Sequence, residues 1–180
     1  MTGSRCRVKA HVRLDGSGMT APAFCVHCGS ALAERLIDGE PRQACTACAW
    51  VHFDNPVAVA GVIVLRDESE DVLLAKPRGG QEYVLVSGFL EAFESVEMAA
   101  VREVREETGL EVAVKHILGS YSCKPIGKNM VFVVCVARLL GGELRVADEL
   151  EDARWFPLTA LPAWPPEWPV AQAFADLQRR

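Results

Sequence analysis

The chain has 180 residues, of which 50% are hydrophobic and 24% are charged, so it can bury one good core and carry a small additional domain. Its formal net charge of −5 argues against broad electrostatic binding to nucleic-acid backbones. No apolar run reaches the roughly 18 residues of a membrane span, so we expect no membrane partner.

Residues 1–23 are predicted to form a flexible N-terminal tail. This segment contains Arg5, Arg7, Lys9 and Arg13 but lacks the continuous apolar region of a secretory signal. We therefore expect a cytoplasmic protein.

Two cysteine pairs mark the next segment, residues 24–54. Cys25-x2-Cys28 and Cys45-x2-Cys48 are separated by sixteen residues, which fits the spacing of a four-thiolate zinc site. Zn²⁺ held by four thiolates has no open position, so the predicted ion is structural. The alternatives are two disulfides or unrelated cysteines, and the missing secretory signal argues against disulfides. The segment is interpreted as a zinc ribbon.

Residues 55–180 are predicted to form one α+β domain that begins where Pro56 forces Asn55 out of the helical region. Apolar and β-branched runs between turn residues predict strands over 57–65, 72–75, 83–86, 111–118, 130–138 and 153–156. A turn is expected at Gly141-Gly142, one helical turn over 158–161 and a terminal helix over 168–177. This order predicts a mixed β-sheet sandwiched by helices.

A central helix is predicted between Ser95 and Gly109. Ser95 is a suitable N-cap, and Gly109 stands where a glycine ends a helix. At 3.6 residues per turn one face of this helix is apolar. The side chains on that face are Met98, Val101, Val104 and Thr108.

The opposite face carries Glu103, Glu106 and Glu107. Like charges at these spacings repel one another, and a cation removes that cost. Oxygen ligands without a nearby histidine favour Mg²⁺ or Mn²⁺ over zinc. A solvated acidic face is the alternative, but the fixed offsets of Gly88 and Glu94 from these residues argue against it.

Residues 88–110 resemble the Nudix box, G-x5-E-x7-R-E-U-x-E-E-x-G-U, in which U is aliphatic. Every defining position is filled, which chance gives on the order of once in a million. The resemblance implies the Nudix fold and metal-dependent attack of water on a diphosphate bridge. The matching residues are Gly88, Glu94, Arg102, Glu103, Val104, Glu106, Glu107, Gly109 and Leu110.

The resemblance also implies roles for these residues. The three glutamates of the helix would bind the divalent ions together with the Gly88 carbonyl. Arg102 would pair with Glu94 and orient the carboxylates. Phe93 stands where the family often has a glycine, so either the turn differs or the ring lines the site.

A cysteine ribbon before the box is similar to the zinc-ribbon Nudix branch that acts on NADH, FAD or ADP-ribose. The marker S-Q-P-W-P-F-P-x-S of the NADH enzymes is absent, whereas Pro125 matches a proline of ADP-ribose pyrophosphatases. We expect cleavage of such a diphosphate to AMP and a second monophosphate. A nucleoside triphosphate pyrophosphatase and a non-catalytic nucleotide sensor are the alternatives. A homodimer is compatible with the family.

Further candidates for substrate binding lie around the box. Tyr83 and Phe89 could stack on a nucleobase, or they could belong to the core. Lys76 and Arg78 could contact phosphate, or they could be solvated. Glu149 matches a glutamate that often supplies an extra metal ligand or base in the family, and a polar loop residue is the alternative.

Overall fold

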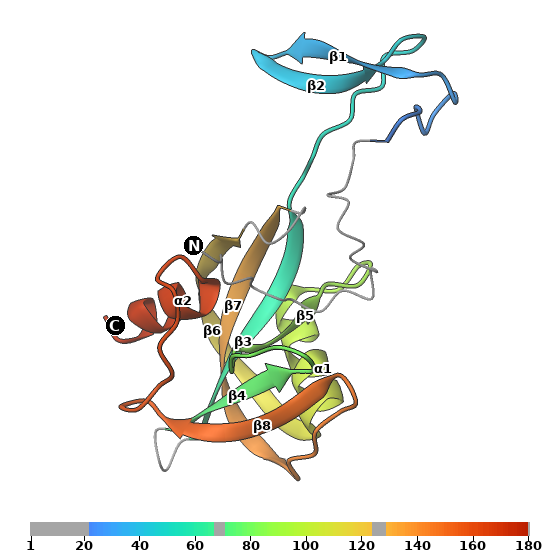
Figure 1. Ribbon diagram of the computed structural model, residues 1–180. Helices are drawn as coiled ribbons and strands as arrows, with labels where there is room; N and C mark the ends of the chain where they lie inside the picture. The colour runs from blue at the N-terminus through green and yellow to red at the C-terminus, as the bar shows by residue number, and fades with distance from the viewer. Residues whose placement is uncertain (1–21, 67–70, 124–128, 180) are drawn as a thin grey trace.

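A computed structural model describes residues 22–66, 71–123 and 129–179 (Figure 1). The tail expected over residues 1–23 lies almost entirely outside these ranges. None of the helices in the described ranges is long and apolar enough to cross a membrane.

The cysteine segment folds as an antiparallel hairpin of β1 (Leu32–Ile37) and β2 (Glu40–Cys45). Asp38 and Gly39 have φ angles of 52° and 83°, and two successive positive values give the tight turn that suits the twist of a hairpin. In Figure 1 the hairpin stands apart from the large sheet and is joined to it by the extended residues 52–56.

The second part of the chain contains a six-stranded sheet in the order β6-β7-β3-β4-β8, with β5 paired to β3. β3 and β7 are parallel and the other pairs are antiparallel, so the sheet is mixed as predicted. The strands are β3 (Val57–Arg66), β4 (Asp71–Pro77), β5 (Val86–Phe89), β6 (Leu110–Cys123), β7 (Met130–Gly142) and β8 (Leu150–Pro157).

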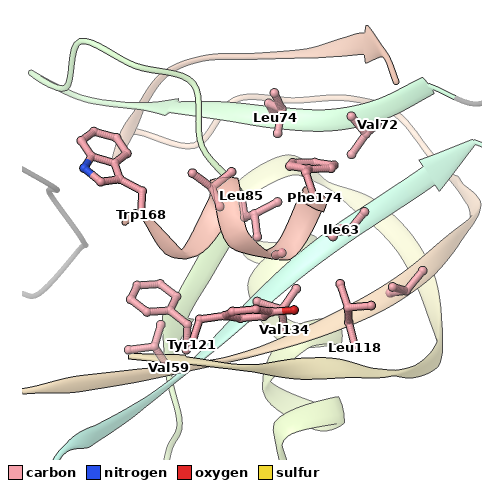
Figure 2. Close-up of a cluster of buried hydrophobic side chains, with 14 of the residues drawn as sticks. Val59, Ile63, Val72, Leu74, Leu85, Leu118, Tyr121, Val134, Trp168 and Phe174 are labelled. Carbon is pink, nitrogen blue, oxygen red and sulfur yellow. The ribbon is translucent and has the colours of Figure 1, made fainter. Parts of the chain in front are cut away.

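Two helices, α1 (Val96–Thr108) and α2 (Pro169–Leu177), cover opposite faces of this sheet. Side chains alternate along a strand, so Ile63 of β3 joins the cluster under α2 while Val62 and Val64 join the cluster under α1. Figure 2 shows the α2 cluster, where Phe174 packs near Ile63. The predicted α+β sandwich is therefore confirmed.

Three local expectations were wrong. β5 begins at Val86 rather than residue 83, because pairing with β3 starts there and Val84 makes only an isolated bridge to Ala75. Gly141 and Gly142 form no separate turn, since the β6–β7 ladder continues through both. Residues 158–161 do not form a helix: the Ala160 N–H donates to the Pro157 carbonyl over 2.9 Å and closes a turn over residues 157–160, and Leu161 follows this turn without regular structure.

Candidate functional site

The ends of α1 lie where the sequence predicted them. The Ser95 hydroxyl accepts a hydrogen bond of 3.2 Å from the Met98 N–H. Gly109 follows the last turn with a left-handed φ of 69° and donates its N–H to the Arg105 carbonyl over 2.9 Å. Both caps satisfy backbone groups that a helix leaves unpaired, so the register of the glutamates on the helix is fixed.

The buried face of α1 differs from the predicted one. Val104 is buried, but Met98 and Val101 are 61% and 37% exposed. Glu103 and Glu107, predicted to lie on the face opposite the apolar one, are buried instead. Residues outside the helix cover that side: β5 approaches Glu103, and residues 143–147 close over the last turn. The periodicity of the helix sequence could not predict either contact, because both involve residues outside the helix.

Gly88 in β5 lies directly against the carboxylate of Glu103. A Cβ atom at position 88 would stand 1.9 Å from the Glu103 Oε1 atom, which is far inside contact distance. Only a glycine therefore permits this approach. The Glu103 carboxylate thus lies against the backbone of β5, and carboxylate oxygens are ligands that hard divalent cations prefer.

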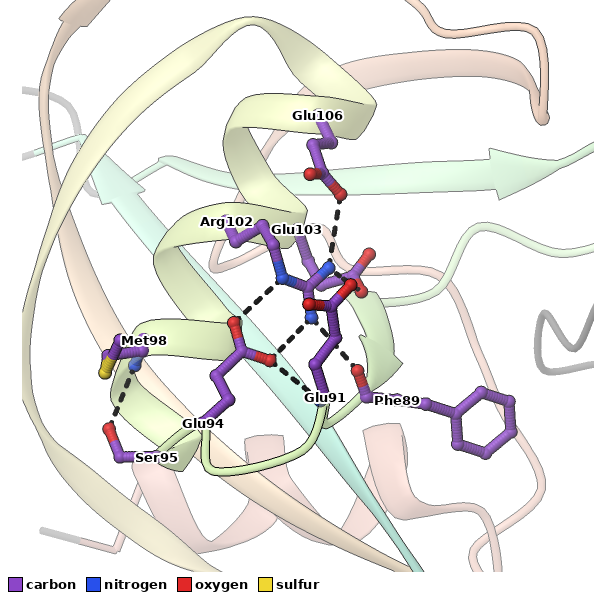
Figure 3. A network of polar contacts seen from close by, with 8 residues as sticks. All are labelled: Phe89, Glu91, Glu94, Ser95, Met98, Arg102, Glu103 and Glu106. Carbon is purple, nitrogen blue, oxygen red and sulfur yellow. Dashed lines mark hydrogen bonds and ion pairs between the residues drawn. The ribbon is translucent and has the colours of Figure 1, made fainter.

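Arg102 is the centre of a polar network that joins α1 to the preceding loop (Figure 3). Its Nε and Nη2 atoms each donate to the Glu94 carboxylate over 2.8 Å, and Nη2 also donates to the Phe89 carbonyl over 3.0 Å. Its Nη1 atom donates to Glu103 over 2.7 Å and to Glu106 over 3.2 Å. These contacts match the five N–H donors of a guanidinium. The pairing of Arg102 with Glu94 that the resemblance implies is present.

This network sets the charge of Glu94. Hydrogen bonds from Arg102 lower the pKa of the Glu94 carboxyl to about 2, and the Glu91 backbone N–H assists over 2.9 Å. The same hydrogen bonds raise the pKa of the Arg102 guanidinium. Glu94 is consequently ionised at neutral pH, so it cannot supply a proton there, and its geometry suits it to position Arg102.

Phe93, beside this network, has a left-handed φ of 66°. The backbone thus adopts the conformation that glycine favours, although a bulky side chain occupies the position. The ring does not fill a cavity, because it is fully exposed to solvent.

Glu149 lies on a segment that packs against the end of α1. The Ala147 N–H donates to the Glu107 carbonyl over 3.0 Å, two residues before Glu149 in the chain. The Glu149 carbonyl accepts from the Arg78 N–H over 2.9 Å, and the residue is exposed. The backbone of this segment therefore contacts the last turn of α1 two residues before Glu149.

The two predicted phosphate contacts have partners within the chain. The Lys76 Nζ atom is paired with Glu151 over 3.0 Å. The Arg78 Nε atom donates to the Asp148 carbonyl over 2.5 Å. Lys76 thus pairs β4 with β8, and Arg78, directly after β4, contacts the residues that lead into β8.

The two aromatic candidates for nucleobase stacking, Tyr83 and Phe89, have different surroundings. Tyr83 contacts Phe156 edge to face at 5.1 Å and donates its hydroxyl to Asp152. Burial and this carboxylate raise the pKa of Tyr83, and the same contact lowers the pKa of Asp152. Phe89 is partly buried against the α2 cluster, and its ring points away from Arg102 in Figure 3. Pro125 lies outside the described residues.

Sequence patterns could not reveal two members of the Arg102 network. The Phe89 carbonyl and the Glu91 N–H are backbone groups, so no residue type marks them. The contacts exist because the loop after β5 returns to the first turns of α1.

The four cysteines of the hairpin gather around one point, with all Sγ atoms within 4.8 Å of one another. Three of the separations are 3.7, 3.4 and 3.7 Å. A tetrahedron with Zn–S bonds of about 2.3 Å has edges of about 3.8 Å, so the set fits Zn²⁺. Backbone N–H groups of His27, Ala47 and Cys48 point at two of the sulfurs over 3.3–3.4 Å. Within the described ranges, no other group of three or more His, Cys, Asp or Glu side chains has its possible ligand atoms gathered so closely.

The fold and the glycine–carboxylate–arginine arrangement define a Nudix domain, and the chain belongs to the Nudix family. A family model described as "NUDIX domain" matches residues 55–176, and one described as "Nudix N-terminal", a zinc ribbon, matches residues 23–54. The resemblance inferred from the box and the cysteine pairs is thereby confirmed.

Two kinds of curated Nudix proteins are similar to this chain. The chain is 36% identical to an NAD-capped RNA hydrolase NudC of Pseudomonas aeruginosa over 156 residues, which are 86% of this chain and 54% of that protein. It is 38% identical to an ADP-ribose pyrophosphatase of Methanocaldococcus jannaschii over 118 residues, 62% of this chain and 68% of that protein. The chain thus spans about half the length of its NudC relatives.

A solved structure supports the same fold. The crystal structure of a NUDIX hydrolase from Nitrosomonas europaea aligns with a TM-score of 0.66 and 26% identity. The alignment covers 88% of this chain and 89% of that one, so it includes more than the six-stranded sheet.

Proposed function

We propose that this protein is a divalent-metal-dependent pyrophosphohydrolase that cleaves the diphosphate of an adenine dinucleotide or of ADP-ribose, releasing AMP and a second monophosphate. The observation that carries the proposal is the contact of the Glu103 carboxylate with Gly88, held by Arg102. The buried Glu103 carboxylate lies against the backbone of a glycine, and Glu106 and Glu107 follow it on the same helix. Such a set of carboxylates is suited to bind a divalent cation together with a substrate phosphate.

Mg²⁺ or Mn²⁺ would be held by Glu103, Glu106, Glu107 and the Gly88 carbonyl. All four donors are oxygens, and the close approach of position 88 to position 103 leaves no side chain between them. Bound there, the ions would lower the pKa of a coordinated water and neutralise charge on the phosphate oxygens.

The residues of the chain would prepare this site in three ways. Arg102 reduces the repulsion between Glu103 and Glu106, because its Nη1 atom donates to both. Glu94 fixes the guanidinium in a bidentate pair. Glu149 is proposed as an additional ligand or base, since its segment contacts the last turn of α1.

The substrate class rests on the ribbon that precedes the box and on the relatives. One relative is named for NAD-capped RNA and another for ADP-ribose, and both substrates contain an adenosine diphosphate unit. FAD, NADH and ADP-ribose are accordingly the candidates that we propose, without a rank among them.

A substrate screen tests the proposal. The purified chain is incubated with FAD, NADH, ADP-ribose, a dinucleoside polyphosphate and nucleoside triphosphates, each with Mg²⁺ or Mn²⁺, and the products are separated by chromatography. We expect AMP from at least one dinucleotide or from ADP-ribose. A triphosphate cleaved with kcat/KM a hundredfold above all of these would refute the substrate class, and no turnover of any compound would indicate a nucleotide sensor.

Substitution of the glutamates tests the site itself. Glu106→Gln and Glu107→Gln should each lower kcat at least about a hundredfold, near 2.7 kcal/mol, because each removes one charged ligand. Glu111→Gln, an exposed glutamate at the start of β6, is the matched control and should retain full activity. Normal turnover in both α1 variants would remove the metal assignment.

A further inference from the structure

A turn over residues 147–150 leads into β8 and carries Glu149 at one of its two central positions. The Leu150 N–H donates to the Ala147 carbonyl over 3.0 Å, and this hydrogen bond closes the turn. At the first position of the turn, the Ala147 N–H donates to the Glu107 carbonyl over 3.0 Å. One end of the turn is therefore tied to the helix that carries the proposed metal ligands.

The ladder between β4 and β8 is irregular next to this turn. Lys76 pairs with Asp152. The next residue, Pro77, pairs with Leu150 and not with Glu151, so β8 contains one extra residue at a β-bulge. Pro77 also has no N–H that it could donate to the ladder. Regular pairing with β4 therefore ends at Leu150, and the centre of the turn lies beyond it.

Arg78, the residue directly after β4, bonds the backbone of this turn. Its own N–H donates to the Glu149 carbonyl over 2.9 Å. Its Nε atom donates to the Asp148 carbonyl over 2.5 Å, and its Nη2 atom donates to the Leu150 carbonyl over 3.5 Å. One residue thus contacts three successive carbonyls that are centred on Glu149. A guanidinium is suited to this task because its donors form a rigid planar fork, which an ammonium lacks.

We infer that Arg78 is a positioning residue for Glu149. By bonding the backbone on both sides of that residue, it fixes the turn relative to β4, while the Glu107 carbonyl fixes the turn relative to α1. The inference rests on the proposed function, in which Glu149 is an additional metal ligand or base. A group in such a role must be held to within about 0.5 Å of its productive position, and a displacement of about 1 Å can lower a rate about a hundredfold.

A direct contact between Arg78 and a substrate phosphate is the alternative role, and the geometry favours it less. The edge of the guanidinium that is formed by Nε and Nη2 already bonds the Asp148 and Leu150 carbonyls. The two roles also predict different kinetics. Loss of a positioning contact lowers kcat, whereas loss of a phosphate contact that is equally strong in the bound substrate and the transition state raises KM.

A double-mutant cycle in the full chain tests the inference with the best substrate of the screen. Arg78→Ala and Glu149→Gln should each lower kcat at least about tenfold, with KM within about threefold of the native value. The double variant should lie within about threefold of Glu149→Gln, because a residue that acts only through Glu149 then has nothing left to position. Arg78→Lys should resemble Arg78→Ala, since an ammonium lacks the fork that bonds carbonyls on both sides of residue 149.

Hydrogen–deuterium exchange of the same proteins measures the hold on the turn without any substrate. Arg78→Ala should raise the exchange rates of the Ala147 and Leu150 amides at least about tenfold, because both amides are protected only while the turn is in place. Arg66→Ala is the matched control. Arg66 also contacts β8, with its guanidinium 4.2 Å from the ring centroid of Trp155, but this contact lies beyond the turn. The control should keep the native exchange rates and the native kcat.

Three results would overturn the inference: losses that add in the double variant, a tenfold higher KM with native kcat in Arg78→Ala, or native exchange in that variant. Native kcat in Glu149→Gln, together with an inactive Glu106→Gln, would also overturn it and would leave the proposed function intact. Failure of the proposed function would instead appear as a native protein without turnover. In that case the exchange rates still decide whether Arg78 holds the turn.

Discussion

At the residue scale, Arg102 holds the acidic side chains of the site close together by hydrogen bonding to three of them. It donates to two carboxylates of its own helix, to Glu94 in the preceding loop and to the Phe89 carbonyl. A lysine could not replace it, because an ammonium has three donors and lacks the planar fork that matches a carboxylate. The arginine thus joins α1 to the loop and offsets the repulsion between Glu103 and Glu106.

The lowered pKa of Glu94 predicts a specific pH dependence of stability. The folded-state pKa of about 2 lies below the ordinary value of 4.5, so the ionised carboxylate stabilises the fold above pH 4.5 and this stabilisation is lost as the pH falls toward 2. Urea unfolding between pH 7 and pH 2.5 should show this decrease in the native protein and a smaller one in Glu94→Gln. Glu111→Gln should follow the native curve. Parallel curves for all three proteins would contradict the assignment.

Gly88 gives a second prediction at the residue scale. Gly88→Ala adds a Cβ atom where the Glu103 carboxylate lies, so the carboxylate must move or the strand must shift. We expect a loss of about 1–3 kcal/mol in the free energy of unfolding and at least a tenfold lower kcat. Gly141→Ala is the control, because a Cβ atom there meets nothing within 4 Å. Equal behaviour of the two variants in unfolding and rate measurements would show that the contact is unimportant.

At the element scale, α1 is positioned by its two ends and by the loop that enters it. Ser95 and Gly109 cap the helix, and the loop from β5 to α1 turns through Phe93 in a left-handed conformation. Such a conformation costs an ordinary residue roughly 1–2 kcal/mol. The loop therefore adopts this turn at a cost in stability, and the turn leads directly to Glu94.

Two substitutions at Phe93 separate the backbone cost from the side chain. Phe93→Gly should be more stable than Phe93→Ala by about 0.5–1 kcal/mol, because glycine relieves the left-handed strain but loses some of that gain to its greater freedom in the unfolded chain. Thermal or urea unfolding of both variants measures the difference. Since the ring is fully exposed, Phe93→Ala itself should be close to the native protein. An alanine variant as stable as the glycine variant would rule out strain at this turn.

At the scale of the whole molecule, the chain combines two structures held together by different forces. The six-stranded sheet is stabilised by apolar clusters on both of its faces. The hairpin β1–β2 has only two strands, and an isolated hairpin of this size is marginally stable in water. The four thiolates gathered at its base provide a site for an ion that would stabilise it.

Removal of the proposed ion should therefore affect the hairpin first. Cys25→Ser and Cys48→Ser should abolish zinc binding and unfold the hairpin, because folding of such small domains is coupled to metal binding by roughly 10 kcal/mol or more. Zinc content and proteolysis within residues 24–54 report this effect. Cys135→Ser, a buried cysteine of β7, should keep one zinc ion per chain. Native protein without zinc, or both hairpin variants with full zinc content, would disprove the assignment.

Most of the features that the sequence alone determined are local. The ends of α1 follow from Ser95 and Gly109, and the four cysteines follow from the short C-x2-C spacing, which holds two sulfurs on one turn wherever it occurs. The register of the glutamates follows in the same way, because a helix fixes the positions of side chains three and four residues apart. The mixed sheet followed from the order of apolar runs.

The tertiary structure alone decided which side of α1 is buried. Helical periodicity placed Met98 and Val101 with the apolar residues, but β5 and the segment 143–147 cover the side that carries Glu103 and Glu107. The start of β5 and the approach of residues 147–149 to the helix were likewise fixed by pairing with distant strands. Burial depends on which elements meet in space, and a contact between residues far apart in the chain leaves no periodic signal in either segment.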